Sequence, residues 1–196
     1  MLHRFELALA GCLMAISTPA SDPQLVVLDA QLGTELLVRY RVVNPRDEEI
    51  WIVCPEPRCA RDRWPPVPFV SADRDVLRLS ALLVDPPDDG LYEAHYQHEL
   101  LRIAPRSTYV GVMSIPQPLE TAVPYPSASP RPVDLVGVRR VELRLGYFRC
   151  LDAPLSARVP PILSPGDVLR CAGGRTAEAA QALLRAESAL ARPRAH

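Results

Sequence analysis

Residues 138–148 read VRRVELRLGYF and show the strongest alternation of side-chain character in the chain. Positions 141, 143, 145 and 147 carry apolar or aromatic side chains, whereas positions 140, 142 and 144 carry charged ones. Successive side chains of a β-strand point to opposite sides of a sheet, so this period of two predicts a strand with one buried face. We expect the first set to face a core and the second set to face solvent.

Similar patterns occur along the rest of the chain and are separated by turn residues. Asn44 and Pro45 form one turn signal, because asparagine tolerates unusual backbone angles and proline fixes its own φ. The sequence APRS at 104–107 is typical of a hairpin between two strands. The other predicted strands span residues 25–28, 35–43, 49–53, 76–84, 99–103 and 108–115.

Short alternating strands with turns between them predict a mainly β protein, an antiparallel β-sandwich of about 7–9 strands. The composition agrees, since 22 prolines against 9 glycines among 196 residues break long helices and confine strands to short runs. By analogy at the level of fold, the sandwich is expected to be immunoglobulin-like, and this analogy implies no function. Strands B, C, E and F of such a fold would be residues 35–43, 49–53, 108–115 and 138–148.

The C-terminal segment departs from the β pattern. Residues 177–191, AEAAQALLRAESALA, consist of helix-forming residues, and Thr176 before them is a suitable N-cap. We therefore expect a C-terminal α-helix packed against the sandwich. The predicted organisation is a signal peptide at 1–20, a β-sandwich domain at 21–172, and a C-terminal helix and tail at 173–196.

The N-terminus predicts export from the cytoplasm. A short basic region, an uncharged and mostly apolar run at 7–16, and small residues before Ser21 follow the layout of a secretory signal peptide. The apolar run is too short to cross a bilayer, and no later run reaches that length, so no transmembrane segment is expected. We expect cleavage after Ala20 and a periplasmic or secreted protein.

An alternative reading of the same segment concerns Cys12. The sequence LAGC at 9–12 resembles a bacterial lipobox, in which the cysteine is lipidated and becomes the new N-terminus. The residues after Cys12 stay apolar, however, where a mature lipoprotein is normally polar. The alternative localisation is therefore a lipid anchor on the membrane through Cys12.

Four further cysteines support export, because an even number of cysteines in an exported chain predicts two disulfides with three possible pairings. Cys54 and Cys59 bracket the proline-stiffened loop CPEPRC and form one preferred pair. Cys150 and Cys171 form the other, closing a loop of about 20 residues. A Cys54–Cys150 bond is disfavoured, since both residues follow the C-terminal ends of antiparallel strands. The alternative use of the four thiolates is a zinc site.

His95 and His98, in the sequence HYQH, form the one cluster of residues suited to binding a metal ion. On a helix or in a loop, two histidines three residues apart can bind one metal ion, whereas in a strand they would face opposite sides. A metal site at these histidines is therefore an alternative to the ordinary role of solvated surface residues.

Signatures of common catalytic sites do not occur in the sequence. It contains no G-x-S-x-G elbow, no P-loop and no dinucleotide-binding fingerprint, and we expect neither a cofactor nor enzymatic activity. The leading hypothesis is an exported, non-catalytic binding or envelope-structural module. The alternatives are a periplasmic metal-binding protein that uses His95 and His98, and a hydrolase whose residues converge only in the fold.

Charge patterning restricts the possible partners. The 22 basic residues are all arginines and face 23 acidic residues, and this near balance argues against binding to nucleic acid. Arg39 and Arg41 lie on one strand, and Arg140 and Arg144 flank Glu142 on another, so we expect two separate solvated stripes with ion pairs and no tight binding to polyanions. A protein partner is expected at an exposed sheet edge or at the proline-rich loops.

Overall fold

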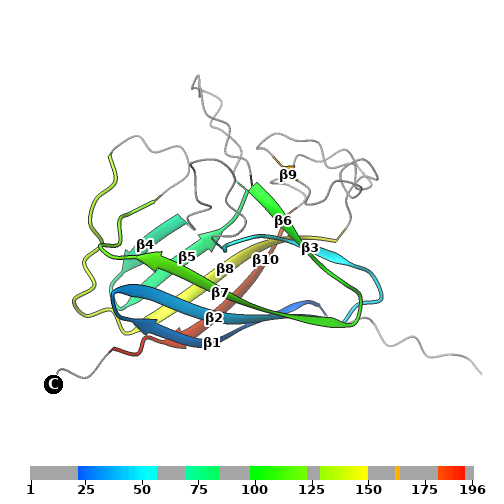
Figure 1. Ribbon diagram of the computed structural model, residues 1–196, viewed down its shortest axis with the longest axis horizontal. Coiled ribbons are helices and arrows are strands. Elements are labelled where there is room, and N and C mark those ends of the chain that lie inside the picture. Colours follow the sequence, from blue (N-terminus) through cyan, green and yellow to red (C-terminus); the bar gives the residue numbers. More distant parts are fainter. Residues whose placement is uncertain are drawn as a thin grey trace, which may run out of the picture.

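Strands account for the fold of the computed structural model, which describes residues 22–56, 69–83, 98–122, 129–149, 162–163 and 181–192 (Figure 1). Each predicted strand coincides with an observed one to within a few residues, and the described part contains no helix. Strands β4, β9 and β10 were not predicted. The ten strands are β1 (Gln24–Leu32), β2 (Glu35–Asn44), β3 (Ile50–Val53), β4 (Phe69–Asp73), β5 (Val76–Ala81), β6 (His98–Ile103), β7 (Ser107–Pro116), β8 (Arg140–Phe148), β9 (Ile162–Leu163) and β10 (Ala182–Ala189).

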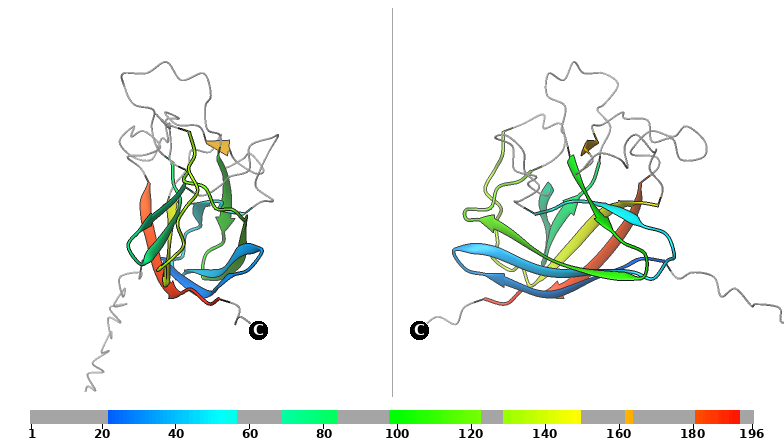
Figure 2. Two further views of the ribbon diagram at one scale, coloured as in Figure 1. Left: turned by 90° about the vertical axis from the view of Figure 1, so that its left-hand side faces the viewer. Right: turned by 45° about the vertical axis from the view of Figure 1, so that its right-hand side comes forward.

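The strands form two sheets that pack face to face (Figure 2). The smaller sheet is antiparallel and has the order β1-β2-β7. In the larger sheet, β10 pairs with one side of β8, and β5 and β3 pair with its other side. β4 continues the sheet beyond β5, and β6 and β9 continue it beyond β3. The β5–β8 pair is parallel, which corrects the prediction of a wholly antiparallel sandwich.

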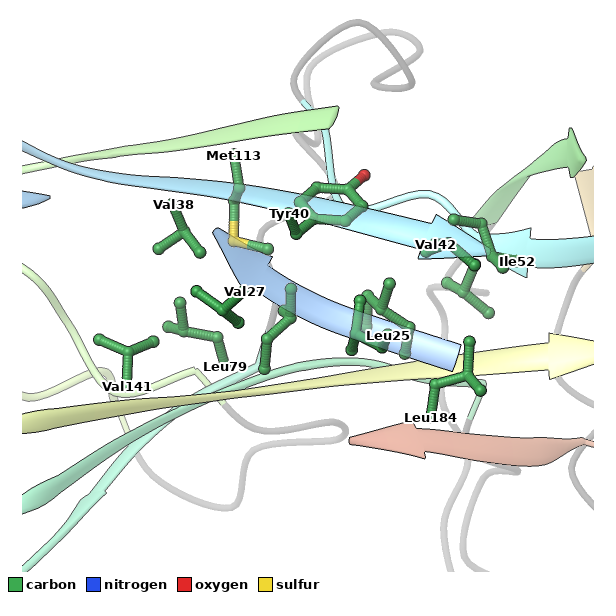
Figure 3. Close-up of a cluster of buried hydrophobic side chains, with 14 of the residues drawn as sticks. Leu25, Val27, Val38, Tyr40, Val42, Ile52, Leu79, Met113, Val141 and Leu184 are labelled. Carbon is green, nitrogen blue, oxygen red and sulfur yellow. The ribbon is translucent and has the colours of Figure 1, made fainter. Parts of the chain in front are cut away.

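One hydrophobic core fills the space between the sheets (Figure 3). As predicted, the side chains at 141, 143, 145 and 147 of β8 are buried, and alternate residues of β2 are buried opposite them. Removing this apolar surface from water is the main source of stability in such a fold. The core side chains shown include Leu25, Val27, Val38, Tyr40, Val42, Ile52, Leu79, Met113, Val141 and Leu184.

The prediction of a C-terminal helix is wrong for residues 182–189, which form strand β10. Alternate residues of this segment point toward the core, and Leu184 and Leu190 are buried. β10 pairs with β8 along its whole length, and hydrogen bonds join Ala191 to Ala30 and Leu32 of β1. Helix propensity is a weak local preference, and here the pairing of a long central strand and the burial of two leucines override it.

Asn44 holds together the turn that follows β2 and the connection between β6 and β7. Its amide Nδ2 donates to the carbonyl oxygen of Glu48 at 2.8 Å and to that of Ala104 at 3.0 Å. The sequence predicts a hairpin at 104–107, but β6 pairs with β3 and β7 pairs with β2. The prediction of a paired hairpin is therefore wrong, because this connection carries the chain from one sheet to the other.

Candidate functional site

Two of the predicted site residues, Cys54 and His98, lie within the described part of the chain. The 1–20 signal peptide and the remaining site residues lie outside it, so the predictions that depend on them stay predictions. Those residues are Cys12, Cys59, His95, Cys150 and Cys171.

Cys54 follows β3 directly and is buried. Its sulfur is in a disulfide, and Cys54 is the one cysteine among the described residues. β3 and β8 pair in the antiparallel sense, which was the premise for disfavouring a bond between Cys54 and Cys150. The pairing of Cys54 with Cys59 remains a prediction.

His98 is the first residue of β6, where it pairs with Leu163 of β9. Within the described ranges, no group of three or more histidine, cysteine, aspartate or glutamate side chains lies close enough to hold a metal ion. A metal site at His95 and His98 therefore stays a prediction.

A buried carboxylate that sequence analysis missed lies just after β3. Glu56 is buried, and its Oε1 accepts hydrogen bonds from the hydroxyl of Tyr40 at 2.7 Å and from that of Tyr109 at 2.5 Å. The two tyrosines come from the neighbouring strands β2 and β7, with their ring centroids 6.3 Å apart. A carboxylate taken out of water needs such donors to remain stable.

Gly111 of β7 leaves the space that the cluster of Glu56, Tyr40 and Tyr109 occupies. A Cβ at this position would lie 2.2 Å from Glu56 Oε1 and 2.5 Å from the ring carbon Cζ of Tyr40. The cluster anchors the segment that follows Cys54 to the inner face of β7. The only sequence signal was a glutamate between two prolines, which does not distinguish a buried residue from an exposed one.

A second buried carboxylate, Glu142, lies on the outer face of the larger sheet. The prediction that Glu142 faces solvent is wrong, because Arg78 and Arg144 cover it. Arg78 Nε donates to Oε2 at 2.7 Å, and Arg144 donates through Nε and Nη2 at 2.8 Å each. Burial raises the pKa of the Glu142 carboxyl, but the bonds from Arg144 and Arg78 outweigh it and hold the pKa below 4.5.

Arg140 is also engaged in ion pairs on this face. Its guanidinium contacts Asp75 at 3.2 Å and Glu187 at 2.9 Å, and the hydrogen bond from Arg140 holds the pKa of Asp75 below its ordinary value. The predicted stripe of Arg140 and Arg144 is therefore a set of ion pairs. These arginines act as partners of carboxylates of the same chain.

The outer face of the β1-β2-β7 sheet is different. Arg39 and Arg41 are exposed on β2, and no acidic side chain of the described residues forms an ion pair with either. The register places Val112 of β7 beside Arg39 and Val110 beside Arg41. These valines are 52% (Val110) and 46% (Val112) exposed, and Leu28 on β1 is 43% exposed. We call this surface the β1-β2-β7 face.

The two arginine stripes lie on different sheets, as predicted, since Arg39 and Arg41 are on β2 and Arg140 is on β8. Arginine guanidinium groups and exposed valines together suit a partner with carboxylates and apolar side chains. Sequence analysis identified these arginines but not the valines beside them, because that neighbourhood depends on the register of β2 and β7.

Comparisons with known proteins give no family for this chain. No protein-family model, no curated protein and no solved structure matches it. In the part of the chain that the structure covers, no helix has the length and apolar character needed to cross a membrane.

Proposed function

We propose that the protein is an exported, non-catalytic binding or envelope-structural module that binds a partner protein through its β1-β2-β7 face. The observation that carries this proposal is the pair of exposed arginines beside two exposed valines on the smaller sheet. On the larger sheet, Arg78, Arg140 and Arg144 bind carboxylates of the chain itself. On the smaller sheet, Arg39 and Arg41 lie beside exposed valines and form no ion pair with any described residue.

The chemistry of this face defines the partner. Each guanidinium can donate two parallel hydrogen bonds to a carboxylate, and the valines offer apolar surface between the strands. The partner should therefore present acidic side chains next to small apolar ones. A single pair of arginines is too little positive charge for a nucleic acid, which needs several cations along its phosphates.

We further propose that the sandwich is of the immunoglobulin-like type. Support comes from the pairing of β2 with β7 in one sheet and of β3 with β8 in the other, as expected for strands B with E and C with F. β10 then pairs with β8 in the position of a following strand. The β4–β5 hairpin, with β5 parallel to β8, is an addition to that arrangement.

The proposal that the protein is exported rests on the N-terminal sequence. The disulfide at Cys54 supports it, because disulfides persist in oxidising compartments. The intact mass of protein from exporting cells tests this part. We expect a chain that begins at Ser21. A species that retains residues 1–20 would exclude cleavage, and a lipidated Cys12 would replace it by the membrane-anchored alternative.

Pull-down from the envelope fraction of the native cells tests the binding face. We expect the wild-type protein to retain a partner that the Arg39→Glu/Arg41→Glu variant loses. Arg185→Glu is the matched control, because Arg185 is an exposed strand arginine on β10 of the other sheet. Equal recovery with the double variant and the wild type would reject the β1-β2-β7 face as the binding surface.

A further inference from the structure

We propose that the protein forms a dimer in which β7 pairs with β7 of a second copy, antiparallel and centred on Gly111. The two small sheets would then join into one continuous sheet with the order β1-β2-β7-β7-β2-β1. The pairing uses the edge of the sheet and leaves Arg39 and Arg41 in water for the proposed partner, but it covers part of the surface of Val110 and Val112 that the same partner would contact.

The first support is the character of β7 as an edge strand. Among the described residues, β7 pairs with β2 on one side only, and Figure 1 shows β7 at the border of its sheet. Its sequence, STYVGVMSIP, has no charged residue in ten, and its one proline is the last residue. Natural edge strands usually carry charges, prolines or bulges that prevent pairing with another chain, and β7 has none of these in its centre.

The second support is that β7 is complementary to itself about Gly111. In an antiparallel pair centred on this residue, Val110 lies opposite Val112 of the second copy, and Val112 lies opposite Val110. All four valines fall on the outer face, because residues 110 and 112 share one face of β7. About half of the surface of each is exposed in the single chain, at 52% and 46%, and pairing would cover much of it.

Charge favours this edge-to-edge arrangement over a face-to-face one. If two β1-β2-β7 faces packed on each other, Arg39 and Arg41 of both copies would be brought together out of water, and their direct cross-strand neighbours include one carboxylate, that of Asp29 opposite Arg39. With edge pairing, these arginines lie on β2, one strand away from the junction, and remain in water. The charges on β2 therefore favour edge pairing as the way in which two copies associate.

Sedimentation velocity on the purified protein between about 1 and 200 µM tests the proposal, since a junction made by one pair of edge strands is expected to be small and to bind weakly. We expect a concentration-dependent monomer–dimer equilibrium. Val110→Lys/Val112→Lys should weaken it at least tenfold by placing four cations at the junction. Leu28→Lys is the control, because Leu28 is an exposed residue of β1, at the other side of the same sheet, and it should leave the dimer unchanged.

A wild-type protein that stays monomeric at 200 µM would overturn the proposal, as would a dimer that survives the double lysine substitution or one that Leu28→Lys disrupts equally. Hydrogen exchange of the wild-type protein gives a readout that does not depend on a variant. The amides of β7 should exchange more slowly at high than at low protein concentration, and unchanged exchange would also contradict the pairing.

Discussion

Gly146 and Gln181 form a contact that allows a quantitative test of the larger sheet. Gln181 precedes β10 on one side of β8, and its side chain passes over Gly146 to reach Leu83 on the other side. There the backbone nitrogen of Leu83 donates to Gln181 Oε1 at 2.8 Å, and Gln181 Nε2 donates to the carbonyl oxygen of Leu83 at 3.1 Å. One amide side chain thus satisfies both backbone groups of a residue beyond the end of β5.

Gly146→Ala should break this bridge. The added Cβ would lie 1.8 Å from Gln181 Oε1 and 2.4 Å from its Cδ, so the amide must move away. Two hydrogen bonds of about 0.5–1.5 kcal/mol each are then lost, and the backbone groups of buried Leu83 remain partly unsatisfied. We expect the free energy of unfolding to fall by about 2–4 kcal/mol.

Urea unfolding of a double-mutant cycle checks the cause. Gln181→Ala alone should lower the free energy of unfolding by a similar amount, because it removes the same two hydrogen bonds. In the Gln181→Ala background, however, Gly146→Ala should be neutral or stabilising by up to about 1 kcal/mol, since the clash is gone and alanine restricts the unfolded chain. Gly33→Ala is the control, because its Cβ would meet no atom closer than 3.9 Å. Additive losses from Gly146→Ala and Gln181→Ala would refute the bridge.

Three further predictions concern the buried polar groups. Gly111→Ala should lower the free energy of unfolding by more than about 2 kcal/mol in the same urea assay, because the buried ring of Tyr40 cannot move aside; a loss under about 0.5 kcal/mol would contradict this packing. Asn44→Ala should lower the free energy of unfolding by about 1–3 kcal/mol, because the carbonyl groups of Glu48 and Ala104 lose their donor. An unchanged urea midpoint would show that water replaces the Asn44 amide as the donor. The lowered pKa of Glu142 means that its carboxylate stabilises the fold above pH 4.5, an effect lost as the pH falls below that value. Glu142→Gln should therefore be less stable than the wild type at pH 7, and this difference should shrink as the pH falls below 4.5 toward the lowered pKa of the folded state; a difference that does not vary with pH would contradict the ion pairs.

The strands were predictable where neighbouring residues alone carry the signal. In 138–148 and 35–43, each second residue is apolar, and this pattern fits a half-buried strand whatever lies beside it. The turn at Asn44 was predictable for the same reason, because the preferences of asparagine and proline are local. Once 35–43 and 138–148 were mapped to strands B and F of the sandwich, the two arginine stripes could be placed on different sheets.

The candidate site was predictable only in part. Arg39 and Arg41 were identified from the alternation of β2, but Val110 and Val112 became their neighbours only through the register of β2 with β7. The carboxylate of Glu56 could not be found from sequence, because its two hydroxyl donors lie 16 and 53 residues away along the chain.

The sequence by itself determined the β character, the faces of the principal strands and the turn at Asn44, because each depends on residues within a few positions of one another. Only the tertiary structure decided that residues 182–189 form a strand. Their composition favours a helix, but the hydrogen bonds and burial that β8 offers exceed a preference of a few tenths of a kcal/mol per residue. It likewise decided that Glu142 is buried, since the arginine Arg78 that covers it comes from β5, 64 residues away along the chain. Contacts between distant segments have no local signature, so the sequence alone could not reveal them.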